Sequence, residues 1–567
     1  KVEMKTVILS SFATIFATLV VNAQDIEQVK KTIDAEKFSD ARKSLKSMVA
    51  TAPDKGKNYF YLGQVYVALE KQDSAKVYFE KGKTAKDAGH LNLIGLGQLE
   101  LLDGNKSAAE THFTNALAFA KKKNTEEQIF ISQAYLKATT PDNSKALIAA
   151  KAAVFSDPKS ALAQVALGDA LVANKNINDA YVAYRTASEL DKTSLRAPLQ
   201  LAIITRNAQA FPEALKAFND ILAINSSYGP AYREKAETNL AWAYAKKSLF
   251  EEKIAAALED YKKYMSLTDV STDAKMKYAD FLILSKKWKE LEVEALAIQK
   301  SDKVNPKVYK YLGYAYSENG NPAEAIKSLT EYMSKVDPKR INGKDYLYLA
   351  KAKLATSMDD KGIVSNQAKF NESIADLTKA ADLNPYLNTE FTEIGIKLYT
   401  GKAYLEASKL FELAVKNTSS KSFARDNYLL GNAILFHAEN KTAAQKATLT
   451  AEFAKANKAY DESIKAAPSN VQDVYYNKGQ LNRVIGTKES NAQAVLDYEG
   501  YVKTVTAKGD AEIAKPTVKE NLFDAYSFIG ANYATTDKAK AIENFKKAAA
   551  INPADTFVKE SLQALSK

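Results

Sequence analysis

The chain has 567 residues, of which 46% are hydrophobic and 26% charged, as in soluble globular proteins and unlike disordered ones. Its net charge of +11 is almost all lysine, since only eight arginines occur, whereas nucleic-acid recognition relies on arginine forks and clustered basic stripes. The composition therefore argues against a nucleic-acid partner. Cysteine is absent, which excludes disulfides, cysteine-ligated metals, thiol nucleophiles and a lipid-modified cysteine.

The first apolar stretch has the three parts of a secretory signal peptide. Lys5 precedes the apolar run Val7–Val21, and a small-residue cleavage site follows at Val21-Asn22-Ala23. We expect a cleaved signal peptide over residues 4–23 and not a membrane anchor, because fifteen residues fall short of the roughly twenty that span a bilayer. The sequence thus predicts an exported protein, periplasmic or associated with the outer envelope, with no transmembrane span after cleavage.

From about residue 25 the chain repeats itself at a fixed period. Residues 160–193 align with residues 194–227, so that Gly168 matches Ala202 and Tyr184 matches Phe218 (202 − 168 = 34). A constant period of this length indicates stacked helical repeats. A Leu followed by Gly or Ala on a first helix, then a small, an aromatic and a small residue on a second, resembles the tetratricopeptide (TPR) motif.

The TPR resemblance implies an all-α solenoid, a right-handed superhelix of about fourteen helix-turn-helix repeats with a C-terminal capping helix. The spacing of the motifs divides the chain into a regular array over residues 25–236, a central array with insertions over 237–385, and a C-terminal array with insertions and the capping helix over 386–567. We expect the insertions near residues 245, 360 and 445 to be lengthened helices or loops, because their composition favours helix and carries no strand signal.

No catalytic or cofactor-binding signature is present, so the sequence predicts a non-enzymatic protein without cofactor or metal. The three histidines, His90, His112 and His437, share no local motif. One tripeptide, Asp73-Ser74-Ala75, resembles the O-glycosylation acceptor of secreted Bacteroidota proteins. The alternative is that its polar residues cap the second helix of a repeat.

In TPR proteins the ligand-facing positions lie on the first helix, about three and six residues before the Gly or Ala and one and four after it. In the N-terminal half these positions are mostly apolar with scattered amides, a face suited to an extended peptide or a partner helix. They are Phe60, Gln64, Val67, Ile94, Gln98, Leu101, Tyr135, Val165, Val172, Leu199 and Ile203.

Arg196, Arg206 and Arg233 fall on the same predicted concave face. A guanidinium can grip a carboxylate with two parallel hydrogen bonds, so this patch is a candidate site for an acidic group of a partner. Two alternatives remain open: solvated surface arginines, and internal pairing with Asp169, Glu237 or Asp280.

The sequence therefore predicts a protein-binding scaffold or assembly factor of the cell envelope, with envelope or secreted proteins as partners. The signal peptide, the richness in Lys, Asn and Tyr and the missing Cys make the chain similar to large exported TPR proteins of Bacteroidota. The alternative function is a periplasmic module that binds glycan or peptidoglycan fragments. Such a module needs aromatic rings that stack on sugars, and the only tryptophans are Trp242 and Trp288.

Overall fold

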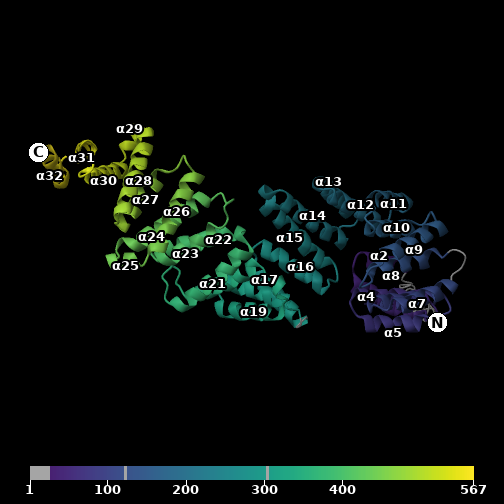
Figure 1. The fold of residues 1–567 in the computed structure, drawn as a ribbon. Coiled ribbons are helices and arrows are strands. Elements are labelled where there is room, and N and C mark those ends of the chain that lie inside the picture. Colours follow the sequence, from purple (N-terminus) through teal and green to yellow (C-terminus); the bar gives the residue numbers. More distant parts are fainter. Residues whose placement is uncertain (1–25, 120–123, 302–304) are drawn as a thin grey trace, which may run out of the picture. The chain divides into compact units, whose positions relative to one another are not determined.

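The computed structural model describes residues 26–119, 124–301 and 305–567, so the predicted signal peptide lies outside the described residues. Throughout this part the regular elements are helices, and β structure is limited to two isolated bridges, Lys55 with Asp87 and Met358 with Val364. Consecutive helices form stacked pairs (Figure 1). The all-α, TPR-type solenoid that the period predicts is confirmed.

The chain divides between residues 290 and 291 into two compact units, called here the N-terminal and C-terminal units. The N-terminal unit, with the helix at the division, contains α2 (Ile26–Asp34), α3 (Phe38–Thr51), α4 (Gly56–Ala68), α5 (Gln72–Gly82), α6 (Leu91–Leu102), α7 (Lys106–Phe119), α8 (Thr125–Lys137), α9 (Asn143–Ser156), α10 (Ala161–Ala173), α11 (Ile177–Leu190), α12 (Arg196–Asn207), α13 (Phe211–Ile224), α14 (Gly229–Ala245), η1 (Lys247–Leu249), α15 (Phe250–Leu267), α16 (Thr272–Leu284) and α17 (Trp288–Ser301).

The C-terminal unit continues with α18 (Lys307–Glu318), α19 (Pro322–Lys335), η2 (Pro338–Arg340), α20 (Gly343–Ala355), α21 (Gln367–Leu383), η3 (Pro385–Leu387), α22 (Asn388–Thr400), α23 (Tyr404–Ala414), α24 (Phe423–Glu439), α25 (Ala443–Ala447), α26 (Thr450–Ala466), α27 (Gln472–Ile485), α28 (Lys488–Ala507), α29 (Asp510–Ile513), α30 (Pro516–Tyr533), α31 (Lys538–Ile551) and α32 (Thr556–Ser566). Over the described residues, with the short helices α25 and α29 left aside, the two units make fourteen consecutive pairs followed by α32. The predicted number of repeats and the capping helix agree with this order.

In several repeats an aromatic ring of the second helix packs where a glycine of the first helix has no side chain. A methyl group added at Gly63 would lie 2.2 Å from the ring of Phe79, and one added at Gly168 would lie 2.4 Å from that of Tyr184. Phe79 meets Gly95 of the following repeat in the same way, at 2.3 Å. The motif glycine therefore lets the two helices of a repeat approach, and the aromatic also fills the gap to the next repeat.

The first helices of the N-terminal unit lie on its inner side. Neighbouring first helices contact one another, as α4 with α6, α6 with α8 and α8 with α10. Among the described residues the second helices of successive repeats make no comparable contact. A stack curves toward the side on which its elements are closest together, so the face made by the first helices is the concave one.

The three predicted insertions take three forms. Near residue 245 the extra residues lengthen α14 to 17 residues and α15 to 18. Residues 356–366 form a loop after α20, closed by the bridge between Met358 and Val364. Near residue 445 the insertion contains the short helix α25. The predicted boundary between the first two repeat arrays, at residue 236, lies within α14. The predicted boundary between the second and third arrays, at residue 385, lies at the start of η3.

Asp73 and Ser74 do not cap the helix that contains them. Helix α5 begins at Gln72, so both residues lie in its first turn, and the cap position Lys71 makes no side-chain hydrogen bond. The capping alternative for this tripeptide is therefore wrong. No helix in the described ranges is both long enough and apolar enough to cross a membrane.

Candidate functional site

Most of the predicted apolar partner-binding residues lie in the core. Phe60 and Ile94 have no exposed surface, and Leu199 is almost fully covered. The Phe60 ring on α4 packs 4.5 Å from the Phe130 ring on α8, two repeats further along the chain. Tyr135 is buried against Phe113. Because tight curvature presses successive first helices together, these side chains fill the stack and are out of reach of a partner. We therefore correct their assignment and place them in the core.

The two predicted amides form a pair between adjacent repeats. Gln64 donates from Nε2 to Oε1 of Gln98 at 2.7 Å, across the 34-residue period. Gln98 is buried, whereas Gln64 and Ile203 remain half-buried. The pair fixes the register of α4 against α6.

The arginine patch is paired internally. Arg196 donates to Asp169 at 2.8 Å, and Tyr184 donates to the other oxygen of the same carboxylate at 2.7 Å. Arg206 and Arg233 share the buried carboxylate of Glu234, at 2.6 and 3.1 Å. Internal pairing with Asp169 was one of the alternatives that the sequence left open, and it is present. The second carboxylate of the patch is that of Glu234, which lies on the same helix as Arg233.

Two further carboxylates reach this patch from the first repeat. Glu36, in the turn between α2 and α3, accepts from Arg233 at 2.5 Å and from the hydroxyl of Tyr264 at 2.8 Å. Asp34, the last residue of α2, accepts from the hydroxyl of Tyr228 at 2.9 Å. Burial raises the pKa of Asp34, although the charge of Arg196 and the hydrogen bond from Tyr228 oppose this. The patch does bind carboxylates, and they belong to the chain itself.

The same positional rule, applied to the C-terminal unit, selects polar and aromatic side chains. Around Gly431 it selects Tyr428, and around Gly479 it selects Tyr476, Gln480 and Arg483. Together with the adjacent side chains of Asn477 and Asp524, these residues form a continuous surface along α24, α27 and α30. This surface is called here the C-terminal row. The C-terminal row consists of Tyr428, Tyr476, Asn477, Gln480, Arg483 and Asp524.

Hydrogen bonds order the C-terminal row. The carboxylate of Asp524 accepts from Arg483 at 2.7 Å, from Gln480 at 2.9 Å and from Tyr476 at 3.3 Å. At the other end Asn477 donates to the hydroxyl oxygen of Tyr428 at 2.9 Å. Burial, with the charge of Asp524, raises the pKa of Tyr476 to about 12, so this hydroxyl stays protonated at physiological pH.

Unlike the inner face near α4 and α6, the C-terminal row is open to solvent. Five of its side chains are half-buried, and that of Arg483 is 45% exposed. A guanidinium carries five N–H donors and an amide both donates and accepts, so the row can bind a second set of polar groups while keeping its own order. The ligand-facing positions predicted from the sequence lie in the N-terminal repeats and do not include the C-terminal row.

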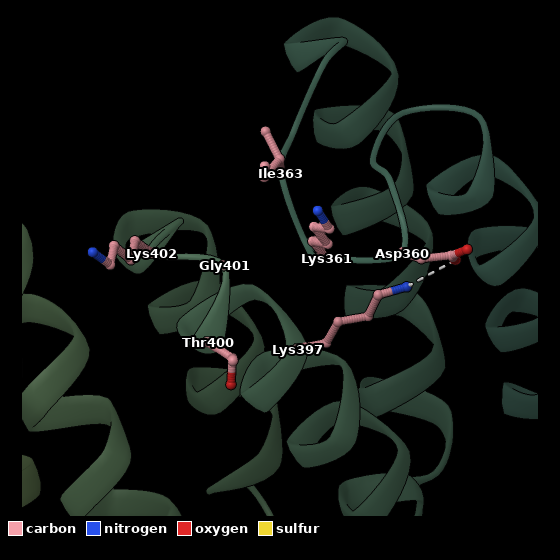
Figure 2. A pocket seen from close by; sticks show the side chains of 7 residues that line it. All are labelled: Asp360, Lys361, Ile363, Lys397, Thr400, Gly401 and Lys402. Atoms are coloured by element: carbon pink, nitrogen blue, oxygen red, sulfur yellow. Dashed lines mark ion pairs between the residues drawn. The ribbon is translucent and has the colours of Figure 1, made fainter.

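A hollow lies beside the loop 356–366. It is lined by Lys361, Lys397 and Lys402 among others, but their ammonium groups point in different directions (Figure 2). Lys397 instead pairs with Asp360 at 3.7 Å. In the described ranges no three His, Asp or Glu side chains are placed to hold a metal ion.

No known family model matches the sequence, and no curated protein matches it. Among solved structures it is similar to the C-terminal part of a TPR repeat-containing protein from Cytophaga hutchinsonii, at 20% identity over 50% of this chain and 98% of that one, with a TM-score of 0.29. A tetratricopeptide repeat protein from Parabacteroides merdae matches at 17% identity over 49% and 98%, with a TM-score of 0.29. A human IFIT1 dimer with PPP-AAAA matches at 14% identity over 68% and 87%, with a TM-score of 0.36.

These similar structures include TPR proteins of Bacteroidota, the family and the group of bacteria that the sequence resembles. At such identities and TM-scores the similarity gives no information about a partner. The assignment of the fold rests on the 34-residue period and on the fourteen helix pairs of the described residues.

Proposed function

We propose that this protein is a non-enzymatic scaffold or assembly factor of the cell envelope that binds a partner protein along the C-terminal row. The observation that carries the proposal is the order and exposure of the row. Three neighbouring first helices present hydroxyl, amide and guanidinium groups in fixed positions on an accessible face. Preorganised groups of this kind bind with a smaller loss of conformational entropy than mobile surface side chains.

The chemistry of the row suits an extended peptide segment. Amides such as Asn477 and Gln480 can pair with both the N–H and the C=O of a peptide backbone, and tyrosine rings offer apolar surface beside a polar hydroxyl. Arg483 adds a site for a carboxylate of the partner. The exported location is supported by the predicted signal peptide alone.

The glycan-binding alternative gains no support from Trp242. Its ring is stacked on that of Phe211 at 5.9 Å, and the ammonium of Lys253 lies 4.1 Å above it. A sugar could not stack on this ring without displacing one of these neighbours.

Affinity capture from solubilised envelopes tests the proposal. The bait is the full chain carrying Gln480→Ala and Arg483→Glu, and the expected result is at least a tenfold loss of the specific partners that the unchanged chain retains. The matched control is Arg185→Glu, since Arg185 is exposed on the second helix α11 and its ion pair among the described residues is with Glu189 of the same helix. An identical set of captured proteins for both variants would refute binding along the C-terminal row.

A further inference from the structure

Residues 34–39, which run from the last residue of α2 through the connecting turn to the first two residues of α3, are docked on a distant part of the N-terminal unit and are called here the turn 34–39. In a solenoid each repeat contacts its neighbours, yet this turn from the first repeat makes hydrogen bonds to residues about 190 to 230 positions later. Its contacts are with the start of α12, the start of α14, the end of α15 and the loop before α16, all within the N-terminal unit. The contact closes the inner face of that unit on itself.

The docked turn is held as a short acidic peptide would be. Its two carboxylates, Asp34 and Glu36, accept hydrogen bonds from Tyr228, Arg233 and Tyr264. Its backbone pairs as well, because the carbonyl of Glu36 accepts from the amide of Asp269 at 3.0 Å.

Two further contacts complete the docking of the turn. The carboxylate of Asp269 accepts from both the amide and the hydroxyl of Ser39 at 2.7 Å. Between the two acids Ala35 is buried in a small apolar cluster with Leu195 and Leu199. The recognised sequence is therefore Asp-Ala-Glu, with both acids bound and the small residue inserted.

The contacts that hold the turn 34–39 are weak enough for the turn to detach from the rest of the N-terminal unit. Asp34, Glu36 and Arg233 are half-buried, whereas the rings of Tyr228 and Tyr264 are buried in the body of the unit. Within the turn itself one residue, Ala35, supplies buried apolar surface. Partly solvated ion pairs and hydrogen bonds contribute little net stability each. By contrast, α3 is anchored to its own neighbour through Ala41 and Leu45, which have no exposed surface. Opening would widen the curve of the stack and leave the first repeat folded.

We propose that the turn 34–39 is an internal ligand that closes the N-terminal unit, and that an acidic protein segment of the form Asp-x-Glu displaces it and binds to Tyr228, Arg233 and Tyr264. This goes beyond the proposed function, which concerns the C-terminal row. The internal ligand is tethered, so it competes at a high effective concentration and lowers the apparent affinity of a partner segment. Removing its acids should therefore strengthen binding of the same sequence added in trans.

The opening is tested on the full chain, which has no native cysteine to interfere with labelling. Spin labels at Lys43→Cys on α3 and Lys263→Cys on α15 should give one narrow distance distribution in the otherwise unchanged chain. Glu36→Lys, and separately Asp269→Lys, should shift this distribution to longer and broader distances. Asp40→Lys is the matched control, because Asp40 is an exposed acid at the start of α3, and it should leave the distribution unchanged. If neither test variant widens it, the turn is a fixed part of the fold and the proposal is wrong.

The partner class is tested with a fluorescent peptide of sequence 31–43 added to the same full-length proteins. The Glu36→Lys protein should bind it at least tenfold more tightly than the unchanged and Asp40→Lys proteins, and adding Arg233→Glu should abolish the gain. A peptide in which Asp34 and Glu36 are replaced by Asn and Gln should bind weakly to all of these proteins. Equal binding to every protein, or none to Glu36→Lys, would overturn the proposal. Gln480→Ala with Arg483→Glu should not change these results, so a failure here is separable from a failure of the proposed function.

Discussion

The two units are built from the same repeat and use their inner faces differently. In the N-terminal unit the predicted inner positions are largely buried between closely packed first helices, and the charged patch is filled by the chain's own turn 34–39. In the C-terminal unit the corresponding positions carry half-buried tyrosines, amides and an exposed arginine. One motif can thus give either a closed or an accessible face, depending on how tightly the repeats curve.

The difference extends into the core. Among the described residues, eight buried side chains up to residue 290 are polar or charged, against eighteen from residue 291 onward. In the C-terminal unit some successive repeats are in contact through their first helices, as α18 with α20. Another two successive repeats are in contact through their second helices, α21 and α23. Its curvature is therefore less uniform, and hydrogen-bonded groups take up more of the space between its repeats. The following predictions test this contrast, from the largest effect to the smallest.

The largest effect is expected at a buried ion pair of the C-terminal unit. Lys478 lies 3.4 Å from Asp497, and both side chains are less than 10% exposed. Lys478→Met leaves a buried carboxylate without its cation, which should lower the free energy of unfolding by about 3–5 kcal/mol. Urea denaturation of the variant measures the loss. The double variant with Asp497→Asn should recover part of it.

The Lys478→Met variant also has a predicted pH dependence. Burial raises the pKa of Asp497, and the charge of Lys478 opposes that rise. Without the lysine the pKa of Asp497 in the folded protein rises further above its value in the unfolded chain. As the pH falls, Asp497 of the folded variant therefore takes up a proton before the unfolded chain does. The destabilisation should therefore be smaller at pH 5 than at pH 8. The pKa of Lys478 itself is raised, so in the unchanged chain its contribution is fully present at both pH values. A larger loss at pH 5 would contradict this assignment.

A second effect should be equal in the two units, because both use the glycine–aromatic contact. A methyl group added at Gly168 would lie 2.4 Å from the Tyr184 ring, and one at Gly431 would lie 2.5 Å from the Tyr460 ring. Gly168→Val and Gly431→Val should each destabilise by about 1–3 kcal/mol through overpacking. Gly104→Asn is the control, since nothing lies within 4 Å of that position and asparagine tolerates its positive φ of 85°. Unequal costs in the two units would show that they do not share this packing.

A smaller effect is expected where the internal ligand meets the N-terminal unit. Tyr228→Phe removes the hydrogen bond to Asp34 and keeps the buried ring, so it should cost about 1 kcal/mol in thermal or urea denaturation. Tyr232→Phe is the comparison, because its hydroxyl donates to the carbonyl of Ser226 at a longer 3.3 Å and is exposed. If Tyr228→Phe costs no more than Tyr232→Phe, the bond to Asp34 does not hold the turn.

The smallest effect is expected for an exposed pair. Lys55 and Asp87 are 2.8 Å apart, but both side chains are more than half exposed. Water screens such a pair and its two side chains lose rotamer freedom, so Lys55→Met should not shift the denaturation midpoint measurably. A clear shift would mean that the neighbouring bridge between the two backbones depends on this ion pair.

The fold was largely predictable from the sequence because the signal is local. The Gly and aromatic positions recur at one period, and the left-handed turn residues follow it in the structure, as at Glu36, Glu70 and Gly104. The accessible site was less predictable. The positional rule finds inner-face residues, but it does not say that Phe60 is buried and Gln480 is not, because burial depends on the curvature of the whole stack.

The docked turn had no local signal at all. Asp34 and Glu36 are ordinary acids between two amphipathic helices, and their partners lie about 200 residues away. Only the three arginines on one predicted face indicated a site for carboxylates. That pattern indicated the arginine patch but not the turn that pairs with it, since the position of the first repeat follows from the summed curvature of the repeats between them.

Site-specific photocrosslinking in the native envelope tests the central claim most directly. A photoreactive amino acid replaces Gln480 in the C-terminal row or, in a matched protein, Gln64 on the inner face of the N-terminal unit. Both positions carry half-buried glutamines of first helices. The account predicts discrete crosslinked partner proteins from position 480 and none from position 64. Crosslinks from position 64 with none from position 480 would contradict it.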